Sequence, residues 1–177
     1  MSLETLKSIY RFCRLPDAAR RECMRDAILG LPRRDPGIDA SIQEAFAWLG
    51  RAQDNSRSCD GGLARHYSLI DGWSASYPET TGYAVPTFLE YAERYRSDEA
   101  KRRARRMLDW LVSIQLDSGA FQGGMIGEGP IVPVAFNTGQ ILLGLASGTR
   151  FFEEYREAMI RAANWLVATQ DPDGCWR

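Results

Sequence analysis

One stretch of the chain, RAANWLVATQDPDGCW at residues 161–176, decides the fold. It joins a Trp-Leu pair to a glutamine, and then to an acidic residue, a glycine and an aromatic residue. The same order occurs in RMLDWLVSIQLDSGAF at residues 106–121. A third copy, at residues 48–62, has the Trp-Leu pair and the glutamine but a longer loop before its glycines. Such self-similarity indicates one supersecondary unit that is used repeatedly.

Each unit contains apolar residues at helical spacing, which predicts two helices per unit. Outer helices are predicted at residues 41–53, about 98–115 and about 149–170, and inner helices begin at Thr81-Gly82 and Thr138-Gly139. Because proline is tolerated only near the first turn of a helix, Pro86 places the start of the first inner helix at residues 80–82. No strand-like alternation remains. The predicted fold class is therefore all-α, with repeated α-helical hairpins.

The hairpins predict a division of the chain into an arm and a repeat domain. Residues 1–36 form an N-terminal helical arm and linker, with two short amphipathic helices separated at Pro16. Residues 37–177 form the repeat domain, with units at about 38–97, 98–148 and 149–177. The third unit has no inner helix, so we expect its open edge to be covered by an oligomer partner or by a missing C-terminal remainder.

The composition narrows the class of protein. The 22 basic and 23 acidic residues give a net charge of −1, so we expect no nucleic-acid partner. We expect no membrane partner and a soluble, cytoplasmic protein, because no apolar run is long enough to cross a bilayer. The four cysteines and one histidine show no ligand spacing, so we expect reduced thiols, no metal and no cofactor.

The Trp-Leu, Gln and Gly-x-Trp elements of residues 161–176 resemble the QW motif of the terpenoid-cyclase and prenyltransferase α/α-toroid superfamily. The resemblance covers about residues 38–177 and implies that part of an α/α toroid forms. It also implies that the repeat residues are scaffold, with each glutamine tying a helix end to the next turn. These structural residues are Trp48, Gln53, Trp110, Gln115, Trp165, Gln170 and Trp176.

Chemistry is expected in the loops that lead into the inner helices, residues 54–83 and 117–140. Both loops combine aromatic residues with hydrogen-bonding side chains, which is what a sugar site requires, since sugar rings stack on aromatic faces while their hydroxyls need fixed partners. The candidate catalytic residues are His66, Tyr77, Glu79 and Asn137. The candidate substrate-binding residues are Trp73, Tyr83, Gln122 and Gln140.

Residues 73–83 and 136–140 also show a looser similarity to toroid proteins of bacterial polysaccharide synthesis and modification. This similarity implies an acidic polysaccharide or oligosaccharide as ligand, and lyase-, epimerase- or hydrolase-like chemistry. By analogy, Asn137 would neutralise a uronate carboxylate, while His66, Tyr77 or Tyr83 would move the proton on the carbon beside it.

Two other functions stay open. An isoprenoid enzyme of the cyclase or prenyltransferase type would need an Asp-rich motif or a zinc site, and the sequence contains no D-x-D-D or D-D-x-x-D. A non-catalytic helical scaffold would need neither. Each candidate residue also has a structural interpretation: His66 as a loop residue, Glu79 as a first-turn acid and Asn137 as a helix cap. The sequence thus leaves the enzyme class uncertain.

Overall fold

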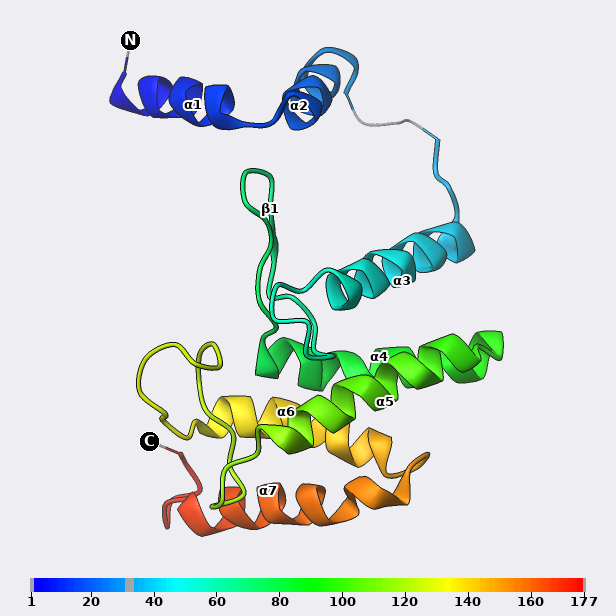
Figure 1. The fold of residues 1–177 in the computed structure, drawn as a ribbon, viewed down its shortest axis with the longest axis vertical. Coiled ribbons are helices and arrows are strands. Elements are labelled where there is room, and N and C mark those ends of the chain that lie inside the picture. The colour runs from blue at the N-terminus through cyan, green and yellow to red at the C-terminus, as the bar shows by residue number, and fades with distance from the viewer. Residues whose placement is uncertain (1, 31–33, 177) are drawn as a thin grey trace.

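The protein is built mostly from α-helices, as the sequence predicts (Figure 1). The computed structural model describes residues 2–30 and 34–176. The helices are α1 Leu3–Arg14, α2 Asp17–Leu29, α3 Ile38–Asp54, α4 Pro78–Tyr95, α5 Asp98–Ser113, α6 Ala135–Gly148 and α7 Arg156–Thr169. A short 3₁₀ turn, η1 Glu153–Tyr155, precedes α7, and two strands, β1 Tyr67–Ser68 and β2 Gly72–Trp73, form a hairpin between α3 and α4. The all-α prediction is thus confirmed except for this two-stranded sheet.

Helices α4 and α6 form the centre of the fold and run in the same direction (Figure 1). Helix α5 connects them and packs on α4, while α7 packs on α6. The side chains between these helices are apolar, and Phe88, Leu108, Ile141 and Leu145 are completely removed from solvent. Burying a side chain of this size contributes about 1.5–3 kcal/mol. This core holds the N-terminal turns of α4 and α6 in a fixed relation.

Glycine makes the contact between α4 and α6 unusually close. A Cβ atom on Gly82 would lie 2.6 Å from the Cα atom of Ile141, and one on Gly144 would lie 2.3 Å from the carbonyl oxygen of Gly82. Pro86 lies inside α4, and its missing N–H group would have been the helical partner of that same carbonyl. The carbonyl of Gly82 is therefore available to the backbone of α6.

Two boundary predictions were wrong. The first inner helix begins at Pro78, so Pro86 lies in its interior and not near its first turn. Helix α4 nevertheless continues past this residue to Tyr95. The third outer helix was expected from about residue 149, but α7 begins at Arg156 after the 3₁₀ turn.

The glutamines of the repeat bind backbone carbonyls in their own loop and in the following outer helix. Nε2 of Gln53 donates to the carbonyls of Gly61 at 2.8 Å and Arg103 at 3.1 Å. Nε2 of Gln115 donates to the carbonyls of Gly119 and Ala158, both at 2.9 Å. Each side chain thereby joins two consecutive units. Gln170 is exposed and makes only the loop bond of this set, to Gly174 at 2.8 Å.

The tryptophans of the repeat have different surroundings. Trp110 is 5% exposed, and a Cβ atom on Gly62 would lie 2.5 Å from its ring, so this tryptophan packs on the loop of the preceding unit. Trp48 has no such loop before it and is 44% exposed. Trp165 is half-buried, and the indole N–H of Trp176 donates to the carbonyl of Leu166 at 2.9 Å. The burial of each tryptophan ring thus differs with the position of its unit in the chain.

The outward face of α6 has no helix on it among the described residues. Gly139 occupies the place in α6 that Gly82 occupies in α4, yet a Cβ atom there would have no heavy atom within 4 Å. Phe136 and Leu143 on the same face are 61% and 55% exposed. The close helix contact made by α4 is therefore not repeated by α6.

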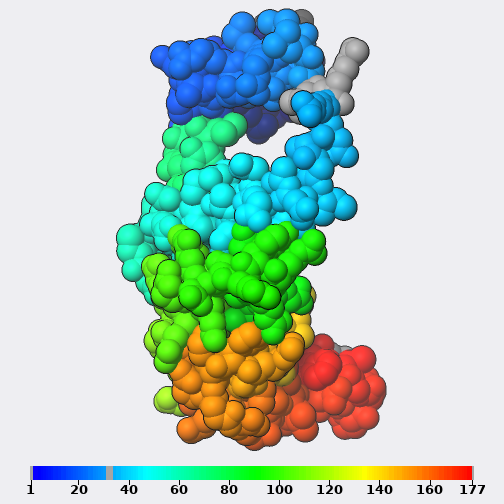
Figure 2. All heavy atoms as spheres, turned by 90° about the vertical axis from the view of Figure 1, so that its right-hand side faces the viewer, coloured from blue at the N-terminus to red at the C-terminus, as the bar shows by residue number. Residues whose placement is uncertain are grey.

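The N-terminal arm consists of two helices that lie at one end of the elongated molecule (Figure 2). The side chain of Ser2 caps α1, since its Oγ accepts a hydrogen bond from the backbone N–H of Thr5. Pro16 separates α1 from α2, as predicted. None of the described residues of either helix is buried.

A bidentate ion pair fastens α3 to α5. The guanidinium of Arg103 donates to both carboxylate oxygens of Asp54, at 2.8 and 2.7 Å. These hydrogen bonds, together with the charges of Arg103 and Arg106, lower the pKa of Asp54, although partial burial opposes the shift.

This ion pair predicts an acid-sensitive contribution to stability. Because the carboxyl pKa is lower in the folded than in the unfolded chain, the contribution is present above about pH 4 and is lost as the pH falls below it. Asp54 is 45% exposed, so the effect should be less than about 1 kcal/mol. Urea unfolding between pH 6 and pH 2 should show a steeper loss of stability for the wild type than for Asp54→Asn. Parallel pH profiles would contradict this expectation.

Candidate functional site

The N-terminal turns of α4 and α6 lie side by side and are held by equivalent loop contacts (Figure 1). The hydroxyl of Thr81 accepts a hydrogen bond from the backbone N–H of Leu63 at 2.9 Å, and that of Thr138 accepts one from Phe121 at 3.0 Å. Both threonines are completely buried. The predicted inner-helix threonines thus lock each loop onto the helix that follows it.

Four of the candidate residues occupy these two helix starts. Glu79 and Tyr83 lie on the first two turns of α4, and Asn137 and Gln140 lie on the first two turns of α6. A Cβ atom on Gly82 would be 3.0 Å from the carbonyl of Gln140, so the two pairs are on neighbouring, tightly packed helices. Glu79 and Gln140 are half-buried, whereas Tyr83 is exposed.

Asn137 has the most unusual environment in this group. Its residue is 5% exposed, and its side-chain Nδ2 atom is buried without a hydrogen-bond partner among the described residues. An unmade hydrogen bond of this kind costs about 1–3 kcal/mol. Asn137 is the third residue of α6, and Val134 is the N-cap, so the interpretation of Asn137 as an N-cap was wrong. The first turn of α6 thus contains a buried hydrogen-bond donor that no described residue uses.

Tyr77 and an arginine that the sequence analysis missed lie next to each other at the start of α4. Tyr77 is the half-buried N-cap residue of α4, and the guanidinium of Arg65 lies 4.9 Å from the centre of its ring. This distance is typical of a cation–π contact. Arg65 is exposed and adds a positive charge near the helix start. Its place beside His66 in the loop was the only signal that the sequence offered.

Gln122 serves its own loop. It is 6% exposed, and its Nε2 atom donates to the carbonyl of Met125 at 3.0 Å. The loop closes further through the backbone, since Val134 donates to the carbonyl of Phe121 and Gly123 donates to that of Val132. Gln122 therefore stabilises its own loop, and its buried side chain is not open to a ligand.

His66 and Trp73 lie on the β1–β2 hairpin, which extends away from α4 and α6 (Figure 1). His66 is exposed, and its backbone N–H donates to the hydroxyl of Ser74. The ring of Trp73 lies 4.8 Å from that of Trp48 and 4.9 Å from that of Tyr67. These three rings form a cluster of their own. The structure therefore does not bring His66 and Trp73 to the starts of α4 and α6.

The hairpin that carries these residues was not predicted. Its strands contain two residues each, which is too short for an alternating pattern to be recognised. Gly72, with φ of 78°, supplies the left-handed turn position, and the hydroxyl of Ser68 accepts hydrogen bonds from the N–H groups of Ile70 and Asp71.

No family model, curated protein or solved structure matches this chain. The site is therefore interpreted from its geometry. Among the described residues, no three side chains of His, Cys, Asp or Glu are grouped so that they could hold a metal ion. None of the helices in residues 2–30 and 34–176 has both the length and the apolar content to span a bilayer. The helix starts present amide, carboxylate and phenol groups, which suit hydrogen bonding to a polar ligand.

Proposed function

We propose that this chain binds an acidic oligosaccharide through the N-terminal turns of α4 and α6, as part of an α/α toroid related to the terpenoid-cyclase type. The single observation that supports this function is the buried side-chain amide of Asn137, which has a hydrogen-bond donor without a partner among the described residues. A uronate carboxylate is a strong acceptor for such a donor. The positive end of the α6 dipole also favours a negative group at this place.

The neighbouring residues suit the rest of a sugar ring. The exposed ring of Tyr83 offers a face for stacking, and Gln140 offers both a donor and an acceptor for hydroxyl groups. The carboxylate of Glu79 would accept hydrogen bonds from sugar hydroxyls. Arg65, above Tyr77, would add attraction for an anionic chain.

Binding has more support than catalysis. The proposed proton transfer needs His66 or a tyrosine beside the carboxylate that Asn137 holds. His66 lies on the hairpin that extends away from α6, so the geometry favours no lyase, epimerase or hydrolase step through it. The isoprenoid alternative has no observation in its favour. One observation favours the scaffold alternative. The side-chain amides of Gln53 and Gln115 donate hydrogen bonds that join consecutive units.

The substitution Asn137→Leu tests the proposal because it should change binding and stability in opposite directions. Removing a buried, unpaired amide should stabilise the fold by about 1 kcal/mol, provided that leucine fits in the same volume. The same change should weaken the binding of uronic-acid oligosaccharides at least about tenfold. Isothermal titration calorimetry and urea unfolding would measure the two effects.

A matched control is Asn164→Leu, which makes the same chemical change at an exposed position of α7. It should leave the binding unchanged. A neutral oligosaccharide of equal length should bind more weakly than the acidic one to the wild type. Equal affinities for the two sugars, or wild-type affinity in Asn137→Leu, would refute the proposal and favour the scaffold function.

A further inference from the structure

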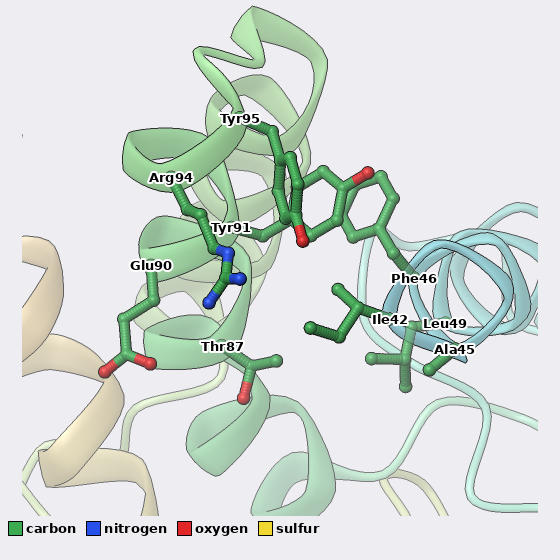
Figure 3. A pocket seen from close by; sticks show the side chains of 9 residues that line it. All are labelled: Ile42, Ala45, Phe46, Leu49, Thr87, Glu90, Tyr91, Arg94 and Tyr95. Carbon is green, nitrogen blue, oxygen red and sulfur yellow. The ribbon is translucent and has the colours of Figure 1, made fainter. Parts of the chain in front are cut away.

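A groove on the opposite side of α4 from the α6 contact has an apolar lining (Figure 3). Its volume is about 280 Å³, and its walls come from α3 and α4. The lining residues are Ile42, Ala45, Phe46, Leu49, Thr87, Glu90, Tyr91, Arg94 and Tyr95. The rings of Phe46 and Tyr91 stack at 3.8 Å and nearly parallel across the groove. Helices α3 and α4 are thus joined at this place by aromatic rings, and apolar side chains remain open beside them.

The repeat shows what covers this kind of face in the next unit. Aligning Gln53 with Gln115 pairs the groove positions of α3 with four positions of α5. Those four, Ala104, Met107, Leu108 and Leu111, are completely buried, because the preceding inner helix, α4, packs against them. Their counterparts on α3, Ile42, Ala45, Phe46 and Leu49, are only partly buried or exposed. The groove is therefore the place where a preceding helix would lie.

Helix α1 has the properties that such a covering helix requires. Its apolar residues share one face, and all of them are exposed: Leu3, Leu6, Ile9, Tyr10, Phe12 and Cys13. Glu4, Ser8 and Arg11 occupy the opposite face, and Lys7 and Arg14 lie at the border of the apolar face. A helix at the end of a repeat stack needs one apolar face for the stack and one polar face for water. The edge of the groove carries charges of both signs, Glu90 and Arg94, and so does α1, where Glu4 pairs with Lys7.

We propose that α1 of a second copy of this chain lies in the α3–α4 groove, so that two chains exchange their N-terminal arms. In its own chain α1 lies apart from the groove and makes no buried contact with it (Figure 1). Exchange between two copies uses the same pair of surfaces twice and closes as a symmetric dimer. The inference does not depend on the sugar site, because no residue of the groove belongs to that site.

The oligomeric state of the full chain tests this dimer. Light scattering over a dilution series should give a dimer for the wild type. Leu6→Arg on α1 and Ala45→Arg in the groove should each weaken the dimer at least roughly tenfold, because each places a charge in the apolar contact. The control Ser8→Arg adds the same charge outside the apolar face of α1 and should leave the dimer intact. Circular dichroism would verify that each variant keeps its helix content.

A cross-link tests the position of α1 directly. Cys13 lies on the apolar face of α1, and Ala45→Cys would place a thiol in the groove, in a chain whose other cysteines are replaced by serine. Oxidation of an equal mixture of ¹⁴N- and ¹⁵N-labelled chains should give disulfide-linked peptides that combine both isotopes. The control Glu44→Cys, one residue away on α3 and outside the groove, should link far less.

Each other outcome overturns the proposal. Disulfide-linked peptides that each carry only one isotope would show that α1 docks on its own chain. A monomer without a link would show that the groove takes no arm. A monomer whose α1 binds vesicles of anionic phospholipid, with loss of binding in Leu6→Arg, would assign the apolar face to a membrane surface.

Discussion

Replacement of Gly144 by alanine is expected to destabilise the protein by about 2 kcal/mol or more. The new Cβ atom would lie 2.3 Å from the carbonyl oxygen of Gly82, and this backbone atom cannot move away without separating α4 from α6. Alanine itself favours a helix over glycine by roughly 1 kcal/mol, so the clash must exceed that gain. Thermal or urea unfolding would measure the difference.

Gly139→Ala provides the matched control for this experiment. It makes the same change in the same helix, but its Cβ atom would have no heavy atom within 4 Å among the described residues. We expect this variant to be more stable than the wild type by about 0.5–1 kcal/mol, from helix propensity alone. Two variants that changed stability in the same direction and by the same amount would show that α4 and α6 do not approach as closely as described.

The second large effect is expected for Gln53→Ala, which should cost about 2–4 kcal/mol. The side chain is buried, and its Nε2 atom donates to two carbonyls while its Oε1 atom accepts from Arg103 at 3.1 Å. Alanine would leave the buried carbonyl of Gly61 and the partly buried carbonyl of Arg103 without this donor. Urea unfolding, with the slope of the transition compared between variants, would measure the loss.

The same substitution at Gln170 separates the effect of burial from that of residue type. Gln170 is exposed and donates to the carbonyl of Gly174, which water can replace. Gln170→Ala should therefore cost no more than about 0.5 kcal/mol. A loss as large as that of Gln53→Ala would contradict the view that the bond to the next outer helix supplies most of the stabilisation.

The helices could be predicted from the sequence because their apolar positions repeat at helical spacing, and α3, α5 and the two arm helices were found in this way. The interior position of Pro86 could not be predicted, because proline is usually confined to the first turn of a helix and α4 is an exception. The exposure of Trp48 was missed for a similar reason. Both tryptophans belong to a Trp-Leu pair followed by a glutamine, but burial depends on the loop of a neighbouring unit.

The candidate site was predicted unevenly. Helix position alone placed Glu79, Tyr83, Asn137 and Gln140 near one another, because the predicted helix starts lie within about one turn of the observed ones. The separation of His66 and Trp73 from this group follows from the hairpin, whose two-residue strands leave no periodic signal. The unpaired donor of Asn137 arises from packing in three dimensions and has no counterpart in the local sequence.

The two-carbonyl contact of the repeat glutamines also determines how the molecule should open. Because Gln53 and Gln115 each bridge a loop and the following helix, the loop of one unit loses part of its support when the next helix unfolds. Within the stack, local unfolding should therefore spread inward from α7, with the amide protons of α7 exchanging with solvent before those of α5 and α4. The side-chain amides of the repeat glutamines would thus couple the opening of each unit to that of its neighbour.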